Sequence, residues 1–213
     1  MDLDNTLINR TGAVSDWVTD FGAARGFSVE DVQVLSAALR ERATPETFEG
    51  LRSTLGLMEP AVALWDSYVA GLAARVVCAP AMLSRLDRLR AAGWSVGVLT
   101  NGATDIQQAK LRATGIFDRV DAVCISEEIG ARKPEPEAFR VAVARCGGKR
   151  PGDVWMVGDN PVTDIAGASA AGLRTIWISA GSGWSFPGQA PDHIAATAVD
   201  AADFLLGLPE TSR

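Results

Sequence analysis

Short apolar segments alternate with amphipathic helical segments from about residue 80 onward. The predicted strands lie at 94–99, 122–125, 154–157 and 175–178, and the predicted helices at 80–92, 105–114, 136–146 and 163–171. Parallel strands need crossover connections, which are usually helices, so this alternation predicts βαβ units around a mostly parallel sheet. The connections should be right-handed. We therefore expect an α/β fold for this part of the chain.

The stretch from residue 13 to residue 78 differs, because its apolar residues recur at helical spacing and it contains no convincing strand. Ser28 followed by Asp31 resembles a capping box, which is typical of a helix start. We expect residues 13–78 to form a small all-α domain that lies over the sheet as a lid. The α/β core would then consist of residues 1–12 and 79–213.

The composition restricts the functions that this fold can have. The chain has 213 residues with a net charge of −6, which argues against a nucleic-acid partner. Its apolar runs are too short to span a membrane, and no signal peptide is recognisable, so we expect a cytoplasmic protein without a membrane partner. The single histidine, His193, excludes a multi-histidine metal site. Three scattered cysteines are typical of reduced thiols: Cys78, Cys124 and Cys146.

Polar residues gather at the predicted carboxyl ends of the strands, which is where ligands bind in open parallel sheets. In chain order they are Asp2 and Asp4, then Thr100 and Asn101, then Lys133, then Asp159 and Asp164. Carboxylates crowded together repel one another, and a divalent cation relieves that repulsion. Oxygen ligands without cysteine or histidine point to Mg²⁺ rather than zinc. Each short motif alone is typical of a turn, but four in this order at strand ends form a specific pattern.

These motifs resemble those of the haloacid dehalogenase-like phosphohydrolases. Asp2-Leu3-Asp4-Asn5-Thr6 matches the first motif of that family, Asp-x-Asp-x-Thr, and Thr100 matches the second. Lys133 matches the third motif, and Gly158-Asp159 followed by Asp164 matches the fourth. The resemblance implies a Rossmann-like three-layer α/β sandwich, with a helical cap inserted after the first motif.

The resemblance also implies a mechanism, namely hydrolysis of a small phosphorylated metabolite. Asp2 would be the nucleophile and would form an aspartyl-phosphate. Asp4 would act first as general acid toward the leaving oxygen and then as general base toward water. Thr100 and Lys133 would bind the phosphoryl oxygens, and the backbone N–H groups of Leu3 and Asn101 would assist them.

The same resemblance implies a set of ligands for Mg²⁺. The carboxylates of Asp2 and Asp159 and the backbone carbonyl of Asp4 would hold the ion. Asp164 would complete the acidic set, either through water or by orienting Lys133.

Single residues help to distinguish a phosphatase from the other enzymes known in the family. Family dehalogenases lack an acidic residue at the position of Asp4, so a phosphatase is favoured. Family phosphonatases use a cap lysine, and residues 13–78 contain none. A phosphomutase shares the same core residues and stays open, as does the choice between monomer and homodimer. Candidate substrate contacts near the predicted cap are Asn9, Arg10, Arg42, Arg52 and Tyr68.

The start of the sequence departs from the family pattern, because only Met1 precedes Asp2 where a buried strand is expected. Loss of that strand would leave its neighbours with unpaired backbone groups. Three explanations are open: numbering that begins within a longer natural chain, a misassigned start codon, or a truncated and inactive relative. The last makes a non-catalytic binding protein the alternative function.

Overall fold

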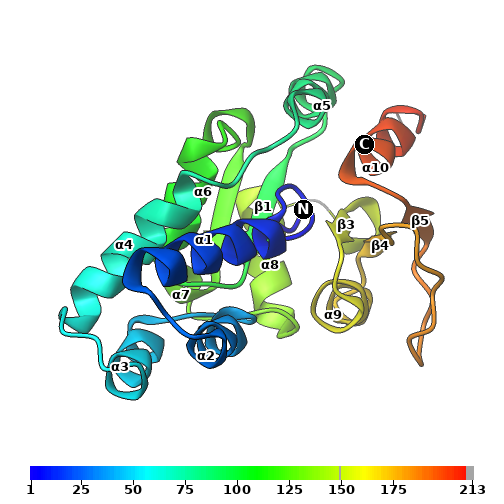
Figure 1. Cartoon of the computed structure of the whole chain (residues 1–213). Helices are drawn as coiled ribbons and strands as arrows, with labels where there is room; N and C mark the ends of the chain where they lie inside the picture. The colour runs from blue at the N-terminus through cyan, green and yellow to red at the C-terminus, as the bar shows by residue number, and fades with distance from the viewer. Residues whose placement is uncertain (149, 210–213) are drawn as a thin grey trace.

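The computed structural model describes residues 1–148 and 150–209 (Figure 1). Its strands are β1 (Gly97–Thr100), β2 (Ala122–Ile125), β3 (Trp155–Gly158), β4 (Arg174–Ile178) and β5 (His193–Ala195). Its helices are α1 (Arg10–Arg25), α2 (Val29–Leu39), α3 (Pro45–Thr54), α4 (Ala61–Ala73), α5 (Pro80–Ala91), α6 (Thr104–Ala113), α7 (Ser126–Ile129), α8 (Pro136–Arg145), α9 (Gly167–Ala170) and α10 (Ala198–Leu206). A π-helical turn, η3 (Pro161–Ala166), precedes α9, and short 3₁₀ turns lie at Phe117–Arg119 and Pro151–Asp153.

All strand pairs in the described chain are parallel, which confirms the α/β class. The strands fall into two sheets, ordered β1-β2 and β3-β4-β5, rather than into one continuous sheet. In β1 and β2, Gly97 lies opposite Ala122 and Thr100 opposite Ile125. The carboxyl ends of β1 and β3 nevertheless open toward the same region, because the first residues of the chain connect the two sheets.

Met1 and Asp2 lie between β1 and β3 and bond to both. The amino group of Met1 donates to the carbonyl of Gly97 at 2.7 Å, and the amide of Leu99 donates to the carbonyl of Met1 at 2.9 Å. On the other side, the amide of Asp2 donates to the carbonyl of Val157 at 2.8 Å. These backbone bonds fix the side chain of Asp2 at the carboxyl ends of the two strands.

A hollow beside Met1 marks the space between the two sheets. Its lining is largely apolar and includes Val98 from β1 and Val157 from β3. No strand of the described residues fills this space. The strands on its two sides, β1 and β3, belong to separate sheets.

Helices α1 to α4 pack around their own apolar cluster on one side of the molecule (Figure 1). Trp17, Phe48, Trp65 and Tyr68 form its aromatic centre, with ring centroids of neighbouring pairs between 5.0 and 6.3 Å apart. The capping box of Ser28 and Asp31 is confirmed, which explains why α2 begins where it does. The boundaries 13–78 of a separate cap domain remain a prediction.

Helix α6 joins this helical block to the rest of the chain. Ala103 and Ile106 belong to the apolar cluster of the block, and the indole nitrogen of Trp65 in α4 donates to the carboxylate of Asp105 in α6. The core of the remaining chain lies where the sheets pack against α5 and α10, and includes Leu3 and Leu86. Helix α6 therefore contacts both parts of the molecule.

The predicted helix at 163–171 is instead the π-helical turn η3 followed by the short helix α9. Strand β5 and helix α10 were not predicted, although β5 contains His193, whose ring stacks on Phe204 at 3.8 Å. This stacking gives His193 a structural role. None of the helices in the described part of the chain combines the length and apolar character needed to cross a lipid bilayer.

Candidate active site

One cleft at the carboxyl ends of β1 and β3 contains all seven residues that the sequence singles out. Asn5, Asn160 and Thr163 complete its lining. The predicted residues in the cleft are Asp2, Asp4, Thr100, Asn101, Lys133, Asp159 and Asp164. The motifs therefore converge in space, although their roles in chemistry stay predictions.

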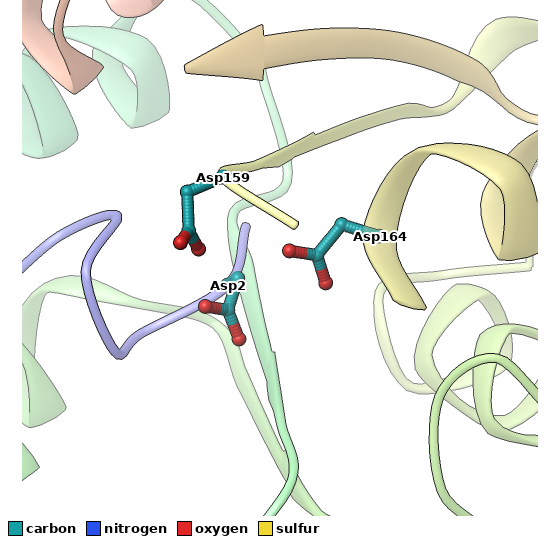
Figure 2. A group of neighbouring side chains, drawn as sticks. All are labelled: Asp2, Asp159 and Asp164. Atoms are coloured by element: carbon teal, nitrogen blue, oxygen red, sulfur yellow. The ribbon is translucent and has the colours of Figure 1, made fainter. Parts of the chain in front are cut away.

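Three carboxylates converge in this cleft from three different segments (Figure 2). Asp2 comes from the amino-terminal segment, Asp159 follows β3 directly, and Asp164 projects from the turn η3. One oxygen of each carboxylate lies within 4.8 Å of the others. Such a set of oxygen atoms suits a hard divalent cation.

Lys133 brings a buried positive charge against this acidic group. Its Nζ donates to Oδ1 of Asp2 at 2.5 Å and to Oδ1 of Asp164 at 2.7 Å, and the residue is 2% exposed. Burial disfavours the ammonium, but the two carboxylates outweigh burial and raise the pKa of Lys133. Lys133 therefore stays charged where a phosphoryl group would bind.

The acidic group carries more negative charge than Lys133 can balance. Burial is the largest influence on Asp2 and raises its pKa to about 7, although Lys133 acts in the opposite direction. Burial and the nearby Asp164 also raise the pKa of Asp159. Three ionised carboxylates facing one ammonium leave two negative charges, which a divalent cation would neutralise. The chemistry of this donor set fits Mg²⁺.

Asp164 is the most enclosed of the three acids, at 1% exposed. Its Oδ1 accepts from Lys133, and its Oδ2 accepts from the backbone amide of Asn160 at 3.1 Å. Gly158 at the end of β3 allows this close packing, because a Cβ there would lie 2.4 Å from Oδ2 of Asp164. Both oxygens of Asp164 are therefore engaged, one of them by Lys133.

The side chain of Asn101 forms hydrogen bonds with the backbone of Lys133. The side-chain amide of Asn101 donates to the carbonyl of Lys133 and accepts from its amide, both at 2.9 Å. This pair fixes the loop between α7 and α8 against the end of β1. Thr100 is 1% exposed, and its hydroxyl accepts a hydrogen bond from Gln107 in α6.

Asp4 is held by a residue that the sequence analysis did not identify. The Nζ of Lys110 in α6 lies 2.6 Å from Oδ1 and 2.7 Å from Oδ2 of Asp4. Gln107, one turn earlier on α6, donates to Oδ2 of Asp4 at 3.3 Å. The scarcity of lysine in this chain is the signal that could have pointed to Lys110, because only three lysines are present.

Thr6 was noted only as the last residue of the first motif. Its hydroxyl donates to Oδ1 of Asp159 at 3.2 Å, and the indole nitrogen of Trp177 donates to the carbonyl of Asp159 at 2.8 Å. Trp184 packs edge-on against Trp177, so the loop after β4 supports the position of Asp159 from behind.

The residues proposed to contact substrate near the helical block do not line the described cleft. Asn9 caps α1 by accepting from the amide of Gly12 at 2.9 Å. Arg10 donates to the carbonyls of Leu39 and Arg40 at the end of α2, at 3.0 and 2.9 Å. The remaining candidates lie within the block or on its surface: Tyr68 is fully buried, Arg52 pairs with Glu49, and Arg42 is exposed.

A model of the haloacid dehalogenase-like hydrolase family matches residues 1–172. The chain therefore belongs to the haloacid dehalogenase-like hydrolases. The parallel α/β fold and the cleft with its converging carboxylates agree with this class.

Among proteins of known function, the chain is similar to a phosphoserine phosphatase from Thermus thermophilus. The two are 39% identical over 107 residues, which make up 50% of this chain and 43% of the phosphatase. The pyrimidine 5′-nucleotidase YjjG of Escherichia coli is 35% identical over 115 residues, which are 54% of this chain and 51% of the nucleotidase. The chain thus spans about half the length of these relatives.

The fold is shared with a solved HAD hydrolase, YfnB from Bacillus subtilis, which is described as bound to magnesium. The TM-score is 0.74 at 19% identity, and the match covers 97% of this chain and 96% of that protein. The similarity in fold therefore extends over nearly the full length of both chains.

Proposed function

We propose that this protein is a Mg²⁺-dependent phosphatase that hydrolyses a small phosphorylated metabolite through an aspartyl-phosphate intermediate on Asp2. The observation that carries the proposal is the contact of the buried Asp2 with Lys133 at 2.5 Å, inside a cleft that also holds Thr100. A nucleophilic carboxylate beside a fixed cation and a hydroxyl group is the arrangement that phosphoryl transfer needs.

In this mechanism a carboxylate oxygen of Asp2 attacks the phosphorus atom, and the bond from phosphorus to the leaving oxygen breaks. Asp4 gives its proton to that leaving oxygen. Asp4 then takes a proton from water, whose oxygen attacks the phosphorus of the aspartyl-phosphate and releases inorganic phosphate and free Asp2. Lys133 and Thr100 bind the phosphoryl oxygens throughout and offset their charge.

The metal in this proposal is held by Asp2, Asp159 and the backbone carbonyl of Asp4, with Asp164 positioned behind Lys133. When bound, Mg²⁺ supplies charge neutralisation for the phosphoryl group. The excess of carboxylates over Lys133 and the raised pKa of both Asp2 and Asp159 support this assignment.

The side chain of Asn101 has a role of its own, beside the backbone N–H that the resemblance assigns to the phosphoryl oxygens. Its side chain is committed to the backbone of Lys133, so its amide group positions the lysine. Only its backbone N–H is proposed to face the phosphoryl group.

The alternatives differ in what they release. A phosphomutase would move the phosphoryl group between two positions of one metabolite without net release of phosphate. A non-catalytic binding protein would bind phosphate without turnover. The presence of Asp4, which contacts Lys110, favours a catalytic protein over a binding protein, because an acid and base beside the nucleophile can assist phosphoryl transfer. A phosphomutase shares Asp4, so release of inorganic phosphate distinguishes it from a phosphatase.

The test is release of inorganic phosphate from p-nitrophenyl phosphate by the full chain, with Mg²⁺ and with a chelator. We expect turnover only with Mg²⁺, and Asp2→Asn should abolish it. Asp118→Asn, which changes an exposed carboxylate outside the cleft, is the matched control and should retain the activity. Turnover by Asp2→Asn at the wild-type rate would refute the proposal.

The substrate class is tested with a panel of phosphorylated metabolites. It should contain phosphoserine, pyrimidine nucleoside monophosphates and glyceraldehyde 3-phosphate, because relatives of this chain are named for those compounds. Selective turnover of one member would name the substrate class. Conversion without phosphate release would favour the mutase.

A further inference from the structure

A second buried lysine contacts one of the acids that line the cleft. Lys110 is 1% exposed, and its ammonium contacts both oxygens of Asp4. Burial lowers the pKa of Lys110, although Asp4 acts in the opposite direction. Removing an ammonium from water is costly, and a buried ion pair contributes little net stability. A contribution to stability therefore does not explain why Lys110 is buried against Asp4.

The geometry shows what the pair does to Asp4. A carboxylate bound through both oxygens by one ammonium cannot rotate about its last side-chain bond without losing a contact. Gln107 adds a third contact at 3.3 Å to Oδ2 of Asp4, from the same face of α6 one turn earlier. Asp4 is therefore clamped by two side chains of one rigid helix.

Gln107 also links Asp4 to the phosphate-binding side of the cleft. Its Nε2 donates to the hydroxyl of Thr100 and, at 3.2 Å, to the carbonyl of Asn101. Its position is tightly packed, because a Cβ on Gly102 would lie 2.7 Å from Cγ of Gln107. One face of α6 thus sets the relative positions of the carboxylate of Asp4 and the hydroxyl of Thr100.

We propose that Lys110, assisted by Gln107, is a positioning residue that aims the carboxylate of Asp4 at the leaving oxygen of the substrate. The proposal rests on the function proposed above, in which Asp4 transfers the proton. Its consequence is selective: Lys110 matters most for substrates whose leaving oxygen cannot depart without a proton. Lys133, which contacts Asp2, matters for every substrate.

The test compares two leaving groups. p-Nitrophenolate departs with little protonation, whereas an alkoxide needs a proton from Asp4. Lys110→Met keeps the apolar part of the side chain and removes the ammonium. We expect it to lower kcat/KM on an alkyl phosphate by roughly 100-fold or more, which is the scale of general acid catalysis. The ratio kcat/KM is the readout because it covers the steps up to departure of the leaving group, before Asp4 acts as base toward water. On p-nitrophenyl phosphate the loss should stay below about 10-fold.

Asp4→Asn serves as the reference, because it removes the proton donor itself and should show the same dependence on leaving group. In the double variant, Lys110→Met should add little to the loss caused by Asp4→Asn, since both act through one group. Gln107→Leu removes neutral contacts only, so it tests the same role if Lys110→Met does not fold. We expect a smaller loss with the same preference for the good leaving group.

Equal losses on both substrates in a folded Lys110→Met or Gln107→Leu variant would overturn the positioning role. Full activity of both variants would overturn it as well. Either result leaves the proposed phosphatase standing, provided that Asp2→Asn is inactive. Absence of turnover by the wild-type chain on every substrate would instead overturn the proposed function and this inference together.

Discussion

Asn101 and Lys133 are joined by two reciprocal hydrogen bonds of 2.9 Å, although 32 residues separate them in the chain. The pair connects the end of β1 to the loop between α7 and α8. It places the ammonium of Lys133 between Asp2 and Asp164. The side chain of Asn101 thereby fixes the backbone that carries the ammonium of Lys133.

The first prediction concerns this pair. Asn101→Ala should lower phosphatase activity by about 100-fold, because displacement of a catalytic group by about 1 Å costs that much. The fold should survive, since the β1 and β2 register does not depend on this side chain. Steady-state kinetics and thermal melting check both points. Wild-type kcat in a folded Asn101→Ala protein would contradict the inferred role.

The second prediction concerns the identity of the cation. Lys133→Arg should lose at least about 100-fold in activity, because a guanidinium fork cannot occupy the compact space between Asp2 and Asp164. Lys133→Met leaves the buried carboxylates without a partner, which should lower the free energy of unfolding by about 3–5 kcal/mol. Urea unfolding without metal measures that loss. Arg140→Met, which removes an exposed ion pair, is the control and should change stability little.

The third prediction concerns pH. The pKa of Asp2 is about 7 in the folded, metal-free chain, against about 3.9 in an unfolded chain. Between these values the folded state keeps a proton that the unfolded state has released. This group therefore stabilises the fold fully below about pH 4, and its contribution is lost as the pH rises to about 7.

Melting temperatures in a chelator, measured for wild type and Asp2→Asn, isolate this contribution as a difference between the two curves. Mg²⁺ competes with the proton for Asp2, so the metal should stabilise the protein more at pH 8 than at pH 5. Equal stabilisation at both pH values would show that Asp2 does not bind the metal.

The fourth prediction concerns Gly158. Alanine there would place a methyl group 2.4 Å from Oδ2 of Asp164, so Asp164 must move. Gly158→Ala should lower stability by about 1–3 kcal/mol and weaken Mg²⁺ binding measured by calorimetry. Gly152→Ala, in the turn before the same strand, meets nothing within 4 Å and is the matched control. Similar behaviour of the two variants would contradict the steric account.

The fold was predictable where local patterns decide the structure. Strand β2 occupies the predicted residues 122–125, and α2 begins at the predicted capping box of Ser28. Strand β5 was missed because it has only three residues and lacks a strand-like run. The turn η3 was predicted as an ordinary helix, because spacing alone does not distinguish a π-helical turn from an α-helix.

The site was predictable to the extent that its residues lie in short motifs at strand ends. Lys110 escaped prediction because its partner, Asp4, lies 106 residues away and only packing of α6 brings them together. The connection between the two sheets depends on backbone bonds made by Met1 and Asp2, which no side-chain pattern encodes.

Both lysines in the described part of the chain are enclosed, Lys110 at 1% and Lys133 at 2% exposed, while Lys149 lies outside the described residues. Reagents that acylate amines can therefore reach Lys110 and Lys133 only when the cleft opens or the chain unfolds. Mass-spectrometric detection of acylation at these two amines would report opening of the cleft directly, without a substrate.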